Sequence, residues 1–281
     1  MNRQLILISN PGNPNDTNYA PSTEDVIKRW RDFFQSPIGG YWQDGEIETY
    51  GEQRPLCSDE LRRMIEVVLD TVQCDYSVIV FCGHGGSTID GKDAIQLPVP
   101  SQGDDRLFPV ENLLGLYGAN VRRTVIIDAC RSLIPLTSQQ LFEQKQYSEV
   151  YRIDGVECGK FYNSLIMEAN PHVELLQSTN LHNHAYGTAT GSLYADTVSS
   201  LVNRESINWK RLALMNNYGQ FDFSMLQMYE SVHAALAPQG RQIPEHHSNV
   251  REFVSFPFVA MHLPTDRAFH TEDAIVEILG K

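Results

Sequence analysis

The sequence predicts an α/β fold with a mostly parallel central sheet of about six strands, flanked by helices on both faces so that the molecule has three layers. Short apolar runs alternate along the chain with segments whose apolar residues recur at helical spacing. Two of these runs, Ser77–Cys82 and Arg123–Ala129, are rich in β-branched residues and too short for independent helices. They favour central strands that are covered on both sides.

The N-terminal part of the chain alternates strand and helix signals. Leu5–Ser9 is apolar and leads into a turn-rich segment, so we expect it to be the first strand. Ser22 and Asp25 fit a capping box at the start of the first helix. Glu46–Tyr50 is the next candidate strand, and Ser58 is placed to cap a second helix with one apolar face.

The rest of the chain continues the alternation. Further strands are expected at Ala94–Val99, Val173–Thr179 and Phe253–Met261, and further helices at Pro109–Tyr117, Glu157–Glu168, 194–201 and Met225–Leu236. The polar, Gln-rich stretch at 133–156 has no strong periodicity and is expected to be a long loop, which in compact domains is usually functional. We expect one domain over 1–281, with a C-terminal tail at 263–281.

Composition and charge narrow the class of protein. The 281 residues include 42% hydrophobic and 20% charged residues, enough for a sizeable core. The net charge of −13 would repel a polyphosphate backbone, so nucleic acid is not expected as a partner. No run approaches the roughly 18 apolar residues of a membrane helix, and no signal peptide is evident. We therefore expect a soluble cytoplasmic protein without a membrane partner.

The chain has five cysteines, at positions 57, 74, 82, 130 and 158. Their odd number, wide spacing and lack of a CxxC pair argue against a disulfide framework and against a zinc site. Most are expected to behave as small buried apolar residues. Cys82 is the last apolar position of its strand and is expected to face the core, which leaves Cys130 as the candidate for chemistry.

His84 and Cys130 each follow an apolar run that is predicted to be a buried strand. His84 lies within the glycine-rich Gly83–Gly86 that follows one buried strand, and Cys130 directly follows another. Ligands of parallel sheets bind beyond the carboxyl ends of the strands, and neighbouring strands lie about 4.8 Å apart. If these two strands are neighbours, the pair has the geometry of a cysteine nucleophile and its acid–base partner. The backbone amides of Gly85 and Cys130 are then placed to receive an oxyanion.

His-Gly after one apolar strand, and Asp-Ala-Cys-Arg-Ser after another, resemble the motifs of the caspase, metacaspase and paracaspase superfamily, in which the His precedes the Cys by about 50 residues. The segments 173–201, 240–245 and 256–259 resemble later parts of prokaryotic members, so the resemblance covers 1–262. It implies a caspase-like three-layer sandwich and a single peptidase domain. It also implies a cysteine endopeptidase that acts on protein or peptide substrates.

Asp128 departs from the caspase pattern, which has Gln at this position. Strand alternation puts positions 128 and 130 on the same face, so Asp128 reaches toward the pocket beside Cys130. A carboxylate there repels an acidic P1 side chain and pairs with Arg or Lys. Metacaspases and paracaspases, which carry an acidic residue here, cleave after basic residues. We therefore expect a basic P1 preference, Arg over Lys. The alternative is that Asp128 is a structural carboxylate with no role in specificity.

The resemblance implies further site residues. Asp16 is the candidate for a second acidic wall of the P1 pocket. Ser178, Thr179 and Asn180 are expected to line the substrate cleft. Asp104 and its neighbour Asp105 evoke the calcium sites of some metacaspases, but two adjacent acids are usually only solvated. No other metal or cofactor is expected.

Regulation is expected at the segment 133–151, which lies where family members carry an activation linker. Lys145 and Arg152 would suit self-cleavage by an enzyme with basic P1 specificity. We expect a partner protein, a small ligand or self-association to activate the enzyme. By analogy with stand-alone bacterial relatives, antiphage defence is a candidate role.

Two other function classes remain open at this point. A caspase-homology module that has lost turnover could serve only as a binding partner. A nucleotide-binding domain is suggested by the glycine-rich turn after a strand, but the chain has neither GxGxxG nor GxxxxGK[ST].

Overall fold

The computed structural model describes residues 1–15, 19–51, 53–54, 56–70, 74–87, 92–97, 107–113, 121–130, 153–180, 185, 187–188, 191–216, 219–240 and 242–263; for 65–70 and 130 it describes the backbone. Among these residues, no helix combines the length and hydropathy that crossing a bilayer requires.

The main sheet has six strands in the order β11-β7-β6-β3-β1-β2, and β4 and β5 extend it from β3. Its strands are β1 (Arg3–Asn10), β2 (Ile47–Tyr50), β3 (Tyr76–Ser87), β4 (Asp93–Gln96), β5 (Leu107–Pro109), β6 (Arg123–Cys130), β7 (Val173–Gln177) and β11 (Glu245–Ser248). The pairs from β2 across to β7 are parallel, and β11 is antiparallel to β7. Two small antiparallel sheets pair β8 (Gly187–Thr188) with β9 (Gly191–Ser192) and β10 (Gln220–Ser224) with β12 (Pro257–His262).

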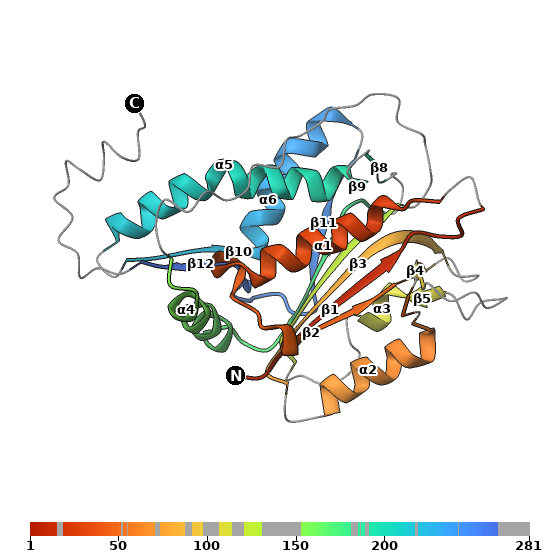
Figure 1. Ribbon diagram of the computed structural model, residues 1–281, viewed down its shortest axis with the longest axis horizontal. Helices are drawn as coiled ribbons and strands as arrows, with labels where there is room; N and C mark the ends of the chain where they lie inside the picture. Colours follow the sequence, from red (N-terminus) through yellow and green to blue (C-terminus); the bar gives the residue numbers. More distant parts are fainter. Residues whose placement is uncertain are drawn as a thin grey trace.

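Helices cover both faces of the main sheet (Figure 1). They are α1 (Ser22–Gln35), α2 (Ser58–Asp70), α3 (Val110–Leu113), α4 (Gly155–Glu168), α5 (Leu193–Met215) and α6 (Met225–Leu236), with 3-10 turns at Pro37–Gly39, Asp44–Glu46 and Ala237–Gln239. One apolar cluster joins the sheet to α1, α4, α5 and α6, and a second joins the opposite face to α2 and α3. The predicted three-layer fold is confirmed.

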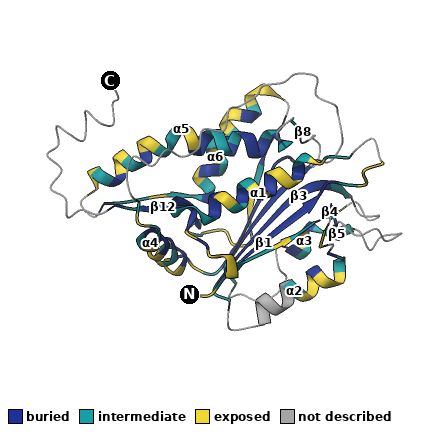
Figure 2. Cartoon of the chain, viewed as in Figure 1, coloured by how far each residue is buried: buried dark blue, intermediate teal, exposed yellow. Residues whose placement is uncertain are grey.

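Burial explains why the central strands are apolar at every position. Along β3, Val78 and Val80 enter the first cluster, and Ile79 and Phe81 enter the second. All four side chains are fully buried, and the sheet is the most continuously buried part of the molecule (Figure 2). Each strand therefore serves two cores at once, as expected for a parallel sheet inside an α/β sandwich.

Several predicted boundaries are wrong for local reasons. The first helix begins at Ser22 itself, after Pro21, and no side-chain cap forms, so the predicted capping box is absent. The helix α4 begins at Gly155, because the Asp154 carboxylate accepts from the amides of Val156 and Glu157; the loop predicted at 133–156 therefore ends earlier. The strands β5, β10 and β11 were not predicted, since each is short and only partly apolar.

A buried carboxylate on β7 ties several segments together. Glu174 is fully buried and accepts hydrogen bonds from His172 Nε2 at 2.9 Å and His246 Nε2 at 3.3 Å. It also accepts from Ser255 Oγ at 2.9 Å and the Phe256 amide at 2.7 Å. Burial alone raises the pKa of a carboxyl, but these donors outweigh it and hold the pKa of Glu174 below its usual value.

Replacing Glu174 by Gln is expected to lower the free energy of unfolding by about 3 kcal/mol at neutral pH, because buried donors lose their charged acceptor. The lowered pKa contributes stability above the unfolded pKa, near 4.5, and this contribution disappears as the pH falls through the folded pKa. The difference between wild type and variant should therefore shrink below about pH 4.5. Urea unfolding at several pH values measures it. Glu157→Gln, which weakens only partly exposed pairs with Lys160 and His262, serves as the control and should change little; equal effects of the two variants would contradict the assignment.

Candidate active site

The carboxyl-end rim of the main sheet brings His84 and Cys130 together. The two residues lie on the adjacent parallel strands β3 and β6, and their Cα atoms are direct partners in the register. Neighbouring strands are about 4.8 Å apart, which is within reach of a thiol–imidazole contact. The condition set by the sequence analysis is therefore met: the two strands are neighbours.

The glycine before His84 allows a close backbone approach. Gly83 has a φ of 155°, and a Cβ on it would lie 2.5 Å from the carbonyl oxygen of Asn10 on β1. Only glycine fits there without moving the neighbouring strand. Beyond this point β3 continues to Ser87, because residues 85–87 pair with β4; the strand does not end at Cys82 as predicted. Cys82 is buried in the core, as predicted.

His84 is held by the chain that follows β1. Its side chain is buried, and Nε2 lies 3.2 Å from the carbonyl oxygen of Pro11. A carbonyl only accepts, so Nε2 carries the hydrogen and Nδ1 is the nitrogen left to exchange a proton. The Pro11 carbonyl also accepts from the Ala20 amide at 2.7 Å.

Asn10 fixes the position of that carbonyl. Its Nδ2 donates to the carbonyl of Gln96 at 2.6 Å, and its Oδ1 accepts from the Gly12 amide at 3.2 Å. Asn10 is itself buried at the end of β1. The residues on both sides of Pro11 are therefore held by hydrogen bonds. The Pro11 carbonyl in turn orients the imidazole of His84 through its Nε2.

Asp128 lies two residues before Cys130 on β6 and is only 3% exposed. Its Oδ2 accepts a short hydrogen bond from the Ser192 hydroxyl, whereas no described residue forms a hydrogen bond of normal geometry with its Oδ1. Burial raises the pKa of the Asp128 carboxyl to about 6, and the neighbouring Asp196 adds to the rise. The Ser192 hydrogen bond, the nearby Ser178 hydroxyl and the charge of Arg29 oppose it.

The segment after β7 supplies further polar groups. Ser178 is buried, its amide donates to the carbonyl of Ile127 at 2.8 Å, and among the described residues its Oγ has the carboxyl of Asp128 nearby but no hydrogen bond of normal geometry. Within the described part of the chain, the Oγ1 of Thr179 and the Oδ1 of Asn180 are also buried without partners. Unsatisfied buried polar atoms are rare in folded proteins, and this segment carries them at consecutive positions.

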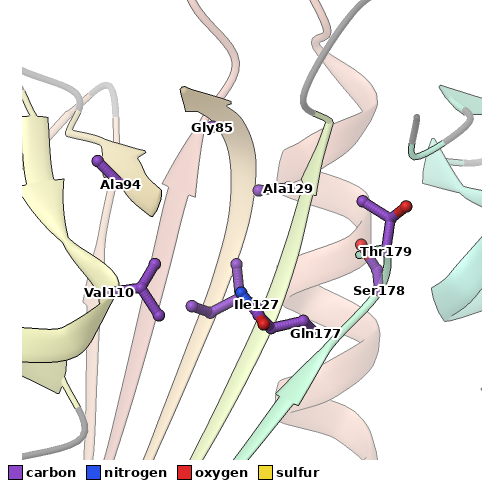
Figure 3. Close-up of a pocket in the computed structure, with 8 residues that line it drawn as sticks. All are labelled: Gly85, Ala94, Val110, Ile127, Ala129, Gln177, Ser178 and Thr179. Atoms are coloured by element: carbon purple, nitrogen blue, oxygen red, sulfur yellow. The ribbon is translucent and has the colours of Figure 1, made fainter. Parts of the chain in front are cut away.

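A small pocket opens on the other face of β6. Its lining residues are Gly85, Ala94, Val110, Ile127, Ala129, Gln177, Ser178 and Thr179 (Figure 3). Ile127 and Ala129 alternate along the strand with Asp128, so this pocket is separate from the carboxyl group of Asp128. Gly85, predicted to supply an oxyanion amide, lines it and pairs with Ile95 of β4.

Sequence reasoning missed three groups that surround Asp128. Ser192 caps α5 and donates to Asp128. Arg29 on α1 donates to Asp196 on α5 at 2.7 Å. A Gly-Ser pair before a helical pattern could have indicated the cap, but the sequence contains no sign that this cap also reaches a carboxylate on a distant strand.

The remaining candidates lie outside the described residues. They are Asp16, Asp104, Asp105, Lys145, Arg152 and most of the predicted activation segment at 133–156. The calcium and activation-linker expectations therefore stay predictions, as does the tail at 263–281 beyond its first residue.

The sequence matches a known protein family, and the fold is similar to those of known proteins. The caspase domain family matches residues 29–254, which is most of the chain. No curated protein matches the sequence. Among solved structures, protein GSU0716 from Geobacter sulfurreducens is similar with a TM-score of 0.56 at 12% identity, covering 88% of this chain and 93% of that one.

Two animal caspases share the fold. Caspase-1 from Spodoptera frugiperda has a TM-score of 0.52 at 13% identity, covering 91% of this chain and 89% of its own. The Drosophila initiator caspase Dronc has a TM-score of 0.50 at 11% identity, covering 87% and 78%. Identities this low show the fold alone, whereas the match to the family extends over most of the sequence. The chain therefore belongs to the caspase domain family, whose members are cysteine peptidases.

Proposed function

We propose that this protein is a cysteine endopeptidase that cleaves protein or peptide substrates after basic residues, Arg in preference to Lys. The observation that carries the proposal is the register of β3 and β6, which pairs His84 with Cys130 at the rim of the sheet. The contact of His84 Nε2 with Pro11 supports it, because this contact leaves Nδ1 available for the thiol.

The proposed chemistry follows the two groups. The Cys130 thiol gives its proton to His84 Nδ1, and the sulfur attacks the scissile carbonyl carbon. Backbone amides, with Gly85 and Cys130 as candidates, receive the oxyanion. His84 then donates the proton to the leaving amine as the C–N bond breaks and the thioester remains. A water molecule, deprotonated by His84, hydrolyses the thioester and restores the thiol.

Basic P1 specificity is proposed from Asp128. Its carboxyl is buried beside the rim, and in the described part of the chain it makes no ion pair and its Oδ1 accepts no hydrogen bond of normal geometry. A guanidinium group supplies both a charge and several N–H donors in a planar arrangement that matches a carboxylate, which favours Arg over Lys. An acidic P1 side chain would meet uncompensated repulsion.

Activation by a partner protein or a small ligand, and a role in antiphage defence, extend the proposal without a structural observation of their own. The catalytically silent binding module is the competing reading. Covalent labelling with an Arg-chloromethylketone separates the two, since a silent module should show no selective modification at Cys130.

Purified full-length protein is expected to hydrolyse fluorogenic peptides with Arg at P1 and, more slowly, Lys. Cys130→Ala and His84→Ala should each abolish turnover and labelling. Cys74→Ala removes a partly exposed thiol just before β3, at the opposite end of that strand from His84, and should leave both intact. Undiminished hydrolysis by Cys130→Ala would sink the proposal, as would absence of both turnover and labelling in the wild type with every candidate activator.

Asp128→Asn is expected to lower kcat/KM for Arg substrates by about 10- to 100-fold, since a charge-assisted hydrogen bond is worth roughly 1.5–3 kcal/mol. Substrates with citrulline at P1, which are uncharged but similar in shape, should lose much less. Steady-state kinetics on the two peptides measures the difference. If both substrates lose the same factor, Asp128 is structural and does not recognise P1.

Asn10→Ala is expected to reduce kcat by about tenfold with little change in KM, because the Pro11 carbonyl then orients the His84 imidazole less well. The pH profile of kcat should change as well, which a purely structural role would not produce. Asn13→Ala, in the same loop but exposed, is the control. A rise in KM with unchanged kcat would show that Asn10 acts on binding instead.

A further inference from the structure

The hydrogen bonds around Asp128 leave its carboxyl half satisfied. Ser192 Oγ accepts from the Ala195 amide at 3.0 Å, so its only hydrogen is directed to Asp128 Oδ2. Oδ1 is buried and accepts no hydrogen bond of normal geometry from the described residues, although the Ser178 hydroxyl is close enough to favour the ionised form. Two neutral hydroxyls are little compensation for a buried negative charge, and the effect of burial remains the larger.

The charged groups near Asp128 do not neutralise it directly. From α1, Arg29 donates to Asp196 at 2.7 Å, and Asp196 also accepts from the Thr188 hydroxyl at 2.7 Å. At Asp128 the charge of Arg29 lowers the pKa of the carboxyl and that of Asp196 raises it, the effect of Arg29 being the larger. Asp128 makes no ion pair with any described residue.

The other titratable groups on the elements packed against Asp128 are few. Tyr194 on α5 is buried with an unpartnered hydroxyl, and burial raises its pKa, so it stays neutral. From β3, Cys82 and His84 occupy the same face of the sheet, and Cys130 is on β6 itself. Among the side chains that the structure describes, no cation forms an ion pair or hydrogen bond with the carboxyl.

A carboxyl in this setting gains most from a cation that enters with the substrate. Before the substrate binds, a proton on Asp128 avoids the cost of burying an uncompensated charge. Once protonated, the carboxyl no longer attracts a guanidinium or ammonium group. Burial, the largest contribution, raises the pKa of Asp128 to about 6, so the neutral form dominates below that pH and the charged form above it.

We propose that Asp128 is a proton-gated specificity residue: the P1 pocket recognises Arg and Lys only when Asp128 is ionised, so mild acidification removes the basic P1 preference without removing peptidase chemistry. Ser192 is the positioning residue that favours the ionised form, because its hydroxyl donates to the carboxylate. The inference rests on the proposed peptidase function and adds a regulation of its specificity.

The test compares two peptides that differ only in Arg or citrulline at P1. The ratio of their kcat/KM values is measured between about pH 5 and pH 8. Protonation of His84 and Cys130 affects both substrates alike and cancels in the ratio. For a single group with a pKa of about 6, the ratio should fall about tenfold between pH 7.5 and pH 5.

Variants sharpen the test. Asp128→Asn should give a low ratio that is flat with pH. Ser192→Ala removes a donor to the carboxylate and should move the midpoint to higher pH. Ser224→Ala removes the matching cap of α6, where Ser224 Oγ accepts from the Gln227 amide, and should leave the midpoint unchanged.

The outcomes are distinct. If the wild type cleaves both peptides with a ratio that does not change with pH, the gate is wrong and the peptidase proposal stands. A midpoint shift in Ser224→Ala equal to that in Ser192→Ala also overturns the role of Ser192. If neither peptide is cleaved and the Arg-chloromethylketone does not label Cys130 under any activating condition, the proposed function itself fails.

Discussion

The parallel pairing of β3 with β6 is the constraint on which the candidate site depends. A slip of one residue would move His84 to the opposite face of the sheet relative to Cys130. Along the middle of both strands the side chains on both faces are apolar, so burial there does not forbid such a slip. Polar contacts at the other end of the strands do: the Ser77 amide donates to the Arg122 carbonyl at 3.1 Å, and Arg123 Nε donates to the Ser77 hydroxyl at 2.9 Å. Contacts at the amino ends of the two strands therefore fix the register of residues at their carboxyl ends.

Two buried carboxylates on neighbouring strands show what hydrogen-bond donors decide. Glu174 on β7 has four donors, and its pKa falls below the usual value. Asp128 on β6 has only the Ser192 hydroxyl in a hydrogen bond and the Ser178 hydroxyl nearby, and burial raises its pKa to about 6 despite both. Burial opposes ionisation at both positions, so the supply of donors decides the direction. The satisfied carboxylate ties chain segments together, whereas the unsatisfied one lies at the rim, where ligands of parallel sheets bind.

The sequence predicted the layers and the pairing of the central strands because their apolar runs are long and continuous. It could also place His84 and Cys130, since each directly follows such a run. It could not predict β11 or the donors to Glu174, because His246 and Ser255 are remote in sequence and lie in polar segments. The Ser192 contact with Asp128 was out of reach for the same reason: a cap signal predicts where a helix begins but not what the capping hydroxyl touches elsewhere.

The proposed catalytic pair and the proposed P1 carboxylate are held in place by different parts of the chain. The proposed chemical pair is built on adjacent strands, and its imidazole is oriented from the chain after β1 through Pro11. The proposed P1 carboxylate is oriented from the start of α5 through Ser192. Because these supports come from different parts of the chain, the proposed function implies that a change near Ser192 alters which side chain is accepted without disturbing the support of His84 through Pro11. On that proposal, a caspase domain changes substrate class through the residues that supply protons and charges to position 128, with the same two strands beneath.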